Sequence, residues 1–153
     1  MGKQNKKNSI LTRIFVLANK IQSVGDALGP AITMKQFQLL DALSKSDKTA
    51  LTLTELADVV GSSRQNVKKM SVILEKQGYL LMSKDASDAR ILRVALTEKS
   101  ADCLRERTQR DKEFIDDLFE GFDDKAIKSM TKNCDRLYKN VAAIEANQLK
   151  NQS

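Results

Sequence analysis

The stretch from Thr52 to Thr97 constrains the fold of this chain more than any other. Thr52 and Glu55 have the spacing of a capping box, and they open a short helix whose apolar residues lie on one face. Gly61 then supplies a turn, after which Ser62–Gln65 has the pattern of another capping box. We expect the second helix to run to about Gln77 and to bury four apolar side chains: Val67, Met70, Ile73 and Leu74.

A β-hairpin is the simplest interpretation of the residues that follow. Gly78 stands where helices end in a left-handed residue, and strand-forming side chains follow it directly. Leu92, Val94 and Leu96 alternate with their neighbours at the period of a half-buried strand. With residues 50–52 as a minimal first strand, the sequence predicts a winged helix-turn-helix. This fold class is mainly α with a small β-hairpin.

Before this stretch, a further helix is predicted to open at Thr33 and Gln36, which form another capping box. It should bury three apolar side chains: Phe37, Leu40 and Leu43. A helix over about residues 8–29 precedes it and should end at Gly29-Pro30, because Pro cannot continue the hydrogen-bond ladder. We therefore place a DNA-binding lobe at about residues 32–97, within a single regulator that occupies residues 1–153.

Both flanking regions carry apolar stripes. Residues 98–150 are predicted to form a charged helix that Thr97 caps and, after Gly121 and Asp123-Asp124, a last helix. Each stripe is either a core face within one chain or a contact between subunits. Cys134 lies on the last stripe and is interpreted as core packing, whereas Cys103 is expected at or near a helix surface. The stripes consist of Ile10, Ile14, Leu17, Ile21, Val24 and Leu28 in the first helix, and Ile127, Met130, Cys134, Leu137, Val141 and Ile144 in the last.

The charge distribution favours a polyanionic partner. The net charge is +6, and residues 64–93 contain seven cations against three anions, whereas residues 94–124 contain five against ten. The chain has no histidine, and its two cysteines lack metal-site spacing, so we predict no metal, no cofactor and reduced thiols. No constellation of catalytic groups is found, so an enzyme is not expected.

The second helix of the lobe has the side chains of a DNA-reading helix, with donors in its first turns and an apolar face behind. Arg90, in the hairpin tip, can enter the minor groove, and Asp88 can fix the tip by pairing with Arg90 or with turn amides. Taken alone, such a helix is more often a solvated face, but the preceding turn and the hairpin favour DNA. The predicted DNA-binding residues are Ser62, Ser63, Arg64, Gln65, Asn66, Lys68, Lys69, Lys84, Asp88 and Arg90.

Several motifs together resemble the MarR family of bacterial transcriptional regulators. They are Leu53-Thr54-Glu55-Leu56-Ala57, Leu74-Glu75-Lys76-Gln77-Gly78-Tyr79-Leu80, Asp88-Ala89-Arg90 and Val94-Ala95-Leu96-Thr97. The resemblance implies a homodimer whose terminal helices interlock, with two lobes on a pseudo-palindromic operator. It also implies an amphipathic or aromatic effector bound in a crevice beside the lobe. Ser87 and Ala89 depart from the family, which often has further arginines there. The dimerisation residues are expected to be Ile10, Ile14, Leu17, Ile21, Leu137, Val141 and Ile144.

The sequence thus predicts a sequence-specific regulator of transcription, a repressor, whose affinity for duplex DNA a small molecule changes. The alternative is a winged-helix module that binds proteins or binds DNA without specificity. We expect a cytoplasmic location and no membrane contact, because the apolar run near the N-terminus is interrupted by Arg13, Asn19 and Lys20. No run is long enough to span a membrane.

Overall fold

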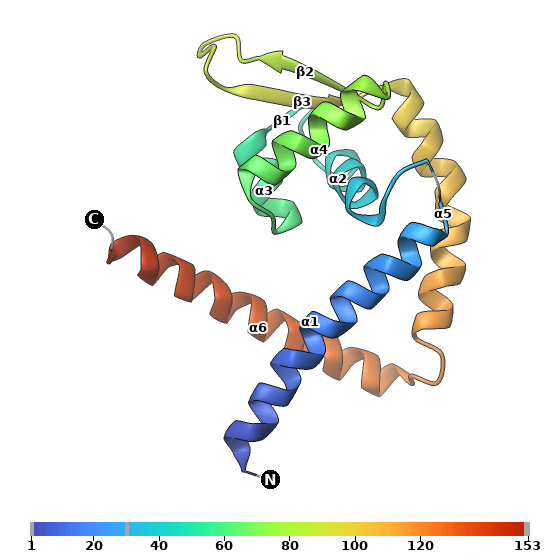
Figure 1. The fold of residues 1–153 in the computed structure, drawn as a ribbon, viewed down its shortest axis with the longest axis vertical. Coiled ribbons are helices and arrows are strands. Elements are labelled where there is room, and N and C mark those ends of the chain that lie inside the picture. Colours follow the sequence, from blue (N-terminus) through green and yellow to red (C-terminus); the bar gives the residue numbers. More distant parts are fainter. Residues whose placement is uncertain (1, 30, 152–153) are drawn as a thin grey trace. The chain divides into compact units, whose positions relative to one another are not determined.

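A computed structural model describes residues 2–29 and 31–151. The chain divides into two compact units, residues 1–114 and 115–153. Nine elements follow in order (Figure 1): α1 Lys3–Ala27, α2 Met34–Ser44, β1 Leu51–Thr52, α3 Leu53–Val60, α4 Arg64–Lys76, β2 Leu80–Lys84, β3 Leu92–Leu96, α5 Glu98–Leu118 and α6 Asp124–Lys150. This order confirms the predicted fold class.

The local signals place most helix ends correctly. Thr33 and Thr52 each form the reciprocal capping box with the residue three positions later. Gly61 and Gly78 take φ angles of 65° and 81°, the left-handed region that glycine enters without strain. The first helix differs from its prediction: α1 begins at Lys3, five residues before position 8, and ends at Ala27. The predicted stop at Pro30 lies outside the described residues.

The predicted capping box at Ser62–Gln65 is wrong by one residue. Ser63 is the residue that caps α4, and its hydroxyl oxygen accepts a hydrogen bond from the backbone N–H of Asn66 at 3.2 Å. The position three residues after the cap is therefore Asn66, and no reciprocal bond from its side chain is formed. A single hydroxyl cap suffices to start this helix.

The sheet is antiparallel, with strand order β1-β3-β2. β1 pairs with β3 through Leu51 and Val94, and β2 pairs with β3 along its whole length. β2 is thus an outer strand, and the backbone N–H of Met82 in this strand donates to a carboxylate oxygen of Glu75 on α4 at 2.8 Å. The hairpin therefore lies alongside α4 (Figure 1), and the helix caps part of the strand edge.

The core of the lobe is formed by α2, α3, α4 and the sheet. Eight of its apolar side chains have almost no exposed surface: Leu39, Leu40, Leu53, Leu56, Val67, Leu74, Leu80 and Val94. The predicted burial of Ile73 is wrong, because its side chain is 48% exposed. At about 100° per residue it lies roughly 120° from the buried face of α4, where Ser71 is buried instead. Phe37 is only half-buried, and Leu39 is a core residue that the sequence pattern did not predict.

Arg107 fastens α5 to the lobe. Its side chain is 5% exposed, and its Nη1 donates to the carbonyl oxygen of Ile32 at 2.9 Å. Its Nε donates to Asp111 at 3.1 Å, and the guanidinium lies 4.7 Å from the centre of the Phe37 ring. A buried charge is costly unless it is paired in this way. The charged pattern of α5 gave no sign that one of its arginines is buried.

The end of α1 packs closely on the start of α2. Gly25 is buried, and a Cβ atom added there would meet the end of the Met34 side chain at 2.2 Å. One residue on, the carboxylate of Asp26 accepts a hydrogen bond from the backbone N–H of Met34 at 2.6 Å. The Met34 side chain therefore packs against α1 at Gly25, where it meets no side chain.

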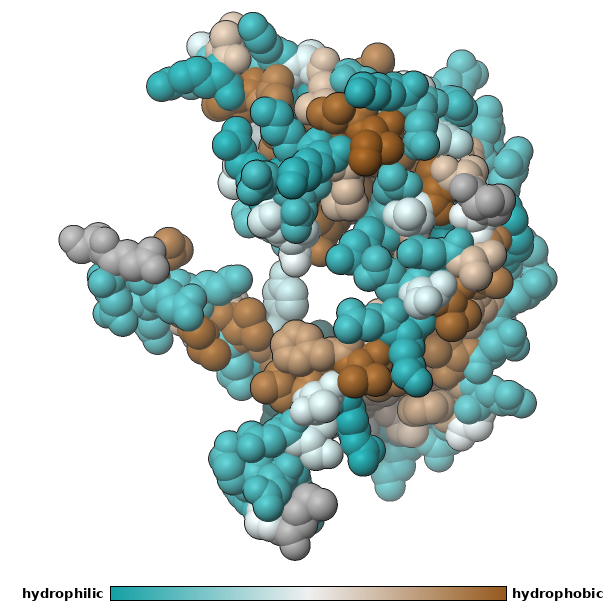
Figure 2. Space-filling model, viewed as in Figure 1, coloured by the Kyte–Doolittle hydropathy of each residue, from teal (hydrophilic) through white to brown (hydrophobic). Residues whose placement is uncertain are grey.

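The apolar stripes of α1 and α6 are largely uncovered in the single chain. Among the described residues of α6 none is buried, and Leu137, Val141 and Ile144 are 47%, 53% and 56% exposed. In α1, Ile10 and Leu17 are more than half exposed, while Ile21 is half-buried. Figure 2 shows hydrophobic side chains on the surface of the helix that carries the C-terminus. The prediction that Cys134 packs in the core of a single chain is wrong, because Cys134 is exposed.

Candidate nucleic-acid interface

The first turns of α4 present polar side chains to solvent. Arg64, Gln65, Asn66, Lys68 and Lys69 are all exposed, and the helix rests on Val67 and Leu74, which are buried. The two sets occupy different faces because the helix repeats every 3.6 residues. The N-terminus of α4 also contributes backbone N–H groups and the positive end of the helix dipole, which favour a phosphate. The two serines before the helix differ: Ser62 is half-buried, and Ser63 is exposed and already used as the cap.

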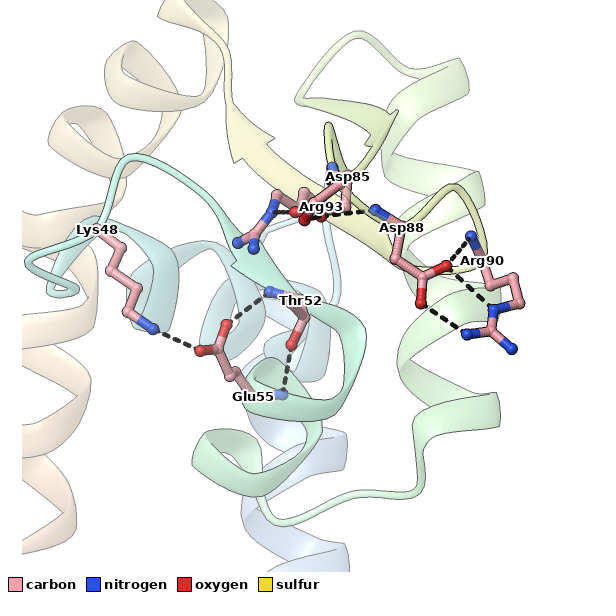
Figure 3. Close-up of polar contacts among 8 residues, drawn as sticks. Lys48, Thr52, Glu55, Asp85, Asp88, Arg90 and Arg93 are labelled. Carbon is pink, nitrogen blue, oxygen red and sulfur yellow. Dashed lines mark hydrogen bonds and ion pairs between the residues drawn. The ribbon is translucent and has the colours of Figure 1, made fainter.

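The wing is the loop between β2 and β3, and its tip holds Arg90 in a fixed position (Figure 3). Nε of Arg90 donates to one oxygen of Asp88 at 3.1 Å, and Nη2 donates to the other at 3.0 Å. The Asp88 carboxylate also accepts from the backbone N–H of Arg90. The Arg90 side chain nevertheless remains 90% exposed. The predicted pairing of Asp88 with Arg90 is confirmed, and the guanidinium lowers the pKa of Asp88 below its ordinary value.

Asp85 organises the rest of the wing. One carboxylate oxygen accepts hydrogen bonds from the hydroxyl and the backbone N–H of Ser87 and from the backbone N–H of Asp88. The other oxygen pairs with the guanidinium of Arg93 on β3. These bonds, that from the Ser87 hydroxyl foremost, hold the pKa of Asp85 well below its usual range. The loop is closed by the backbone N–H of Asp85, which donates to the carbonyl oxygen of Ile91 at 2.8 Å.

The sequence did not predict the roles of Asp85 and Arg93. The signal for Asp85 is available in the sequence, because Asp two residues before Ser in a polar loop is typical of a side chain that bonds turn amides. The signal for Arg93 is weaker, since its pairing depends on the register of β3. Lys84, which was predicted, is the last residue of β2 and is exposed.

A second polar cluster fixes the start of α3, which precedes the reading helix (Figure 3). Glu55 accepts a hydrogen bond from the backbone N–H of Thr52 at 2.8 Å and pairs with Lys48 at 2.5 Å. The Lys48 ammonium, together with the bond from Thr52, lowers the pKa of Glu55 to about 2. The ionised carboxylate of Glu55 thus holds the first turn of α3, where the helix-turn-helix begins.

A cavity of about 270 Å³ lies in the first unit, between the end of α1, α5 and the lobe. Its charged wall consists of three cations and two carboxylates: Lys99, Arg107, Arg110, Asp102 and Glu106. The Tyr79 ring contributes an aromatic face, with the Lys99 ammonium 4.6 Å from its centre. Cys103 also lines the cavity, and burial raises the pKa of its thiol, which keeps it protonated.

Two kinds of site are not found in the part of the chain that the structure describes. No group of three or more acidic, cysteine or histidine side chains is placed to hold a metal ion. No described helix combines the length and apolar character needed to span a bilayer.

The fold, the exposed α4 and the wing together define a winged helix-turn-helix protein. Comparison with known proteins gives the family: the model of the MarR family matches residues 32–92. The resemblance of the motifs is therefore confirmed, and residues 32–92 match the model of the MarR family.

Individual relatives agree with this assignment. The transcriptional repressor MprA of Escherichia coli K12 is 34% identical over 70 residues, which are 46% of this chain. The chain spans 40% of the length of that relative. A MarR protein from Peptoclostridium difficile has 23% identity and a TM-score of 0.79, with 86% of each chain covered. BpsR of Bordetella bronchiseptica, whose DNA binding is regulated by 6-hydroxynicotinic acid, has 18% identity and a TM-score of 0.75, covering 90% of this chain and 96% of that one. These two structures show the shared fold.

Proposed function

We propose that this protein is a homodimeric, sequence-specific DNA-binding regulator of transcription that acts as a repressor in the cytoplasm. The observation that carries the proposal is the pairing of an exposed, donor-rich α4 with an ordered wing that presents Arg90. The match to the MarR-family model and the repressor MprA support the same function.

The chemistry of α4 suits the major groove. An arginine there binds guanine with two hydrogen bonds, and Gln or Asn does the same with adenine, so Arg64, Gln65 and Asn66 would read bases. Lys68 and Lys69 would hold phosphates, which fixes the register of the helix on the duplex. Ser62 and Ser63 precede the N-terminus of α4, whose backbone N–H groups would meet the phosphate chain.

The wing would contribute a second contact. Arg90 is exposed and held at the tip of a loop, the arrangement that suits a narrow minor groove of strongly negative potential. Asp88 orients the guanidinium and reduces the side-chain entropy lost on binding. Lys84 at the base of the loop would meet the backbone phosphates.

The exposed stripes of α1 and α6 support the homodimer. Large apolar patches that remain uncovered in one chain mark interaction surfaces. A second copy would cover Ile10, Ile14, Leu17, Ile21, Leu137, Val141 and Ile144. The dimer would set the distance between two reading helices to about one turn of DNA, which matches a pseudo-palindromic operator.

The effector would be a small aromatic acid in the cavity beside Tyr79. Lys99 and Arg110 would pair with its carboxylate, and the tyrosine ring would stack on its aromatic part. BpsR, whose DNA binding responds to 6-hydroxynicotinic acid, supports this class of ligand. The cavity adjoins α5 and the end of α1, so a ligand there contacts both the lobe and the helices that flank it.

The function is tested by selecting bound duplexes from a random pool and measuring their affinity by fluorescence anisotropy at several salt concentrations. We expect the selected duplex to bind at least about a thousandfold more tightly than bulk DNA. Arg90→Ala should weaken binding and lower the salt slope by about 0.9, the value for one phosphate contact. Lys112→Ala, which removes an exposed cation from α5, is the charge-matched control and should change neither.

The base-reading role has its own test. Asn66→Ala and Arg64→Ala should each alter the selected sequence, at a cost of about 1–3 kcal/mol for a bidentate contact. An unchanged consensus in both variants would make these residues phosphate contacts. Equal affinity for every duplex would leave the alternative, a winged-helix module without sequence specificity.

The effector is tested by titrating benzoate and hydroxybenzoates into the complex with the selected duplex. We expect the acids to release DNA, and Arg110→Ala to raise the concentration needed because one carboxylate partner is lost. Release that is unaffected by Arg110→Ala and Lys99→Ala would place the effector elsewhere.

A further inference from the structure

One face of α6 carries a stripe of cations, which we call the α6 basic stripe. Its members are exposed and recur every three or four residues: Lys125, Lys128, Lys132, Arg136 and Lys139. At about 100° per residue they project within an arc of roughly 80°. None of these five side chains forms an ion pair within the part of the chain that the structure describes. Unlike Arg107 or Arg93, these side chains are therefore not used to hold the fold together.

The basic stripe lies opposite the apolar stripe of the same helix. The centres of the two stripes are roughly 170° apart around the axis. When the apolar stripe is covered by a second copy, the cations remain on the outside. A basic amphipathic helix can also enter a bilayer surface by about 5–10 Å with its apolar face. A second copy that covers the apolar stripe removes this option and leaves the cations for a partner on the polar side. The arrangement thus favours a partner that meets the helix from its polar side.

The length and chemistry of the stripe match a regular polyanion. From Lys125 to Lys139 the helix rises about 21 Å at about 1.5 Å per residue. Duplex DNA carries one negative charge per about 1.7 Å of its axis with both strands counted, so about a dozen phosphates lie within this length and the stripe would face those on its own side. Four of the five cations are lysines, compact charges that bind phosphate without reading bases. Asp135 lies at the edge of the stripe, which leaves four positive charges in excess along this length.

We propose that the α6 basic stripe is a second DNA contact, which binds the phosphate backbone without sequence specificity and is separate from α4 and the wing. It would hold either a flank of the bound duplex or another duplex segment. The inference does not depend on a specific operator, because it concerns affinity for duplex DNA of any sequence.

The test compares two triple variants that remove the same charge. The stripe variant is Lys128→Gln, Lys132→Gln and Lys139→Gln, and the control is Lys3→Gln, Lys6→Gln and Lys7→Gln in α1. Glutamine keeps helix propensity close to that of lysine, and circular dichroism and sedimentation verify that helix content and assembly are unchanged. Affinity for a random-sequence duplex is measured over a range of salt concentrations with the full chain.

We expect the stripe variant to lower the slope of log affinity against log salt by about 2.7, at about 0.9 per phosphate contact, and the control to keep the wild-type slope. A further variant with arginine at the same three positions should keep the slope, because the charge remains. Equal slopes for the stripe variant and the control would overturn the inference. The inference would also be overturned if the stripe variant kept its affinity for DNA and lost only its binding to phosphatidylserine vesicles. The same holds if it lost only its self-association.

Two further measurements separate this inference from the proposed function. The first compares the effect of the stripe variant on affinity for a long duplex and for a minimal selected duplex. Only the long duplex has a flank, so an effect confined to it indicates a flank contact and not a second segment. If selection yields no preferred sequence, the proposed function fails while the slope difference remains. If a preferred sequence is found and the stripe variant keeps the full slope, the stripe fails alone.

Discussion

Leu40 and Leu137 are both leucines on the apolar face of a helix, yet they have opposite surroundings. Leu40 in α2 has no exposed surface, whereas Leu137 in α6 is 47% exposed. The same contrast separates the lobe, with its closed core, from the helices that flank it. The lobe encloses its apolar residues with residues of the same chain. The apolar side chains of α1 and α6 stay largely exposed in the single chain, and this difference divides the mutations below into two classes.

The largest expected effects come from removing those two leucines. Leu40→Ala should lower the free energy of unfolding by about 2–5 kcal/mol, because a cavity forms in a core that cannot fully close. Leu137→Ala should instead lower it by an amount that depends on protein concentration, as expected for a residue buried by association. Urea denaturation at two protein concentrations distinguishes the two. If the loss of unfolding free energy in Leu137→Ala is independent of protein concentration, Leu137 is not buried by association and the contrast with Leu40 fails.

The second prediction concerns the junction of the lobe with α5. Arg107→Met should cost about 2–4 kcal/mol, because it leaves Asp111 and the carbonyl oxygen of Ile32 without their partner. Arg105→Met is the matched control: its arginine is 76% exposed in its pair with Asp102, and its loss should cost less than about 1 kcal/mol. The same denaturation experiment compares them. Equal losses of unfolding free energy in the two variants would mean that the buried contacts of Arg107 do not hold α5 to the lobe.

A smaller effect is expected from two glycines with similar backbones. Gly61 in the lobe and Gly121 before α6 have φ angles of 65° and 81°, with open space where a Cβ would lie. Alanine at either position should lower the free energy of unfolding by about 1 kcal/mol, because its Cβ disfavours the left-handed backbone conformation. Hydrogen exchange should show lower protection throughout the lobe in Gly61→Ala, but near the α5–α6 turn in Gly121→Ala. Identical exchange patterns would show that the two regions unfold as one.

The smallest expected effect is a dependence on pH. Folding lowers the pKa of Glu55 from 4.5 to about 2, so its contribution to stability is present above about pH 4.5 and is lost as the pH falls through about 2. Glu55→Gln keeps a side chain that can cap Thr52 but loses the pairing with Lys48. Its thermal midpoint should lie below that of the wild type at pH 7 and meet it near pH 2. A constant difference over this range would exclude the ionised carboxylate as the cause.

Sequence reasoning located the elements of the lobe well because local signals agree there. The capping boxes at Thr33 and Thr52, the left-handed Gly61 and Gly78, and the alternation along β3 all depend on near neighbours. Where two adjacent residues could serve the same purpose, as with Ser62 and Ser63, the predicted cap was the wrong one. The burial of Ile73 was also mistaken, since its place on the helix face depends on what packs against α4.

The roles of Arg107 and Arg93 could not be predicted, because each depends on a partner distant in the sequence. Arg107 bonds to Ile32, which lies 75 positions away, and nothing in the charged pattern of α5 marks it as buried. The predicted DNA-binding residues were chosen by chemical type, and most of them are exposed, but their role remains a prediction. The contact that covers α1 and α6 lies between chains and remains a prediction.

The hydrogen bond from Met82 to Glu75 has a consequence for the solubility of the protein. An outer strand with unpaired N–H groups is a template on which another strand can add, and such addition is a route to aggregation. The Glu75 carboxylate occupies one of these N–H groups on β2 and places a negative charge at the same edge. A strand approaching from another molecule would have to displace that charge before it could pair. The helix that faces DNA in the proposed function thus also protects the edge of the sheet from the addition of another strand.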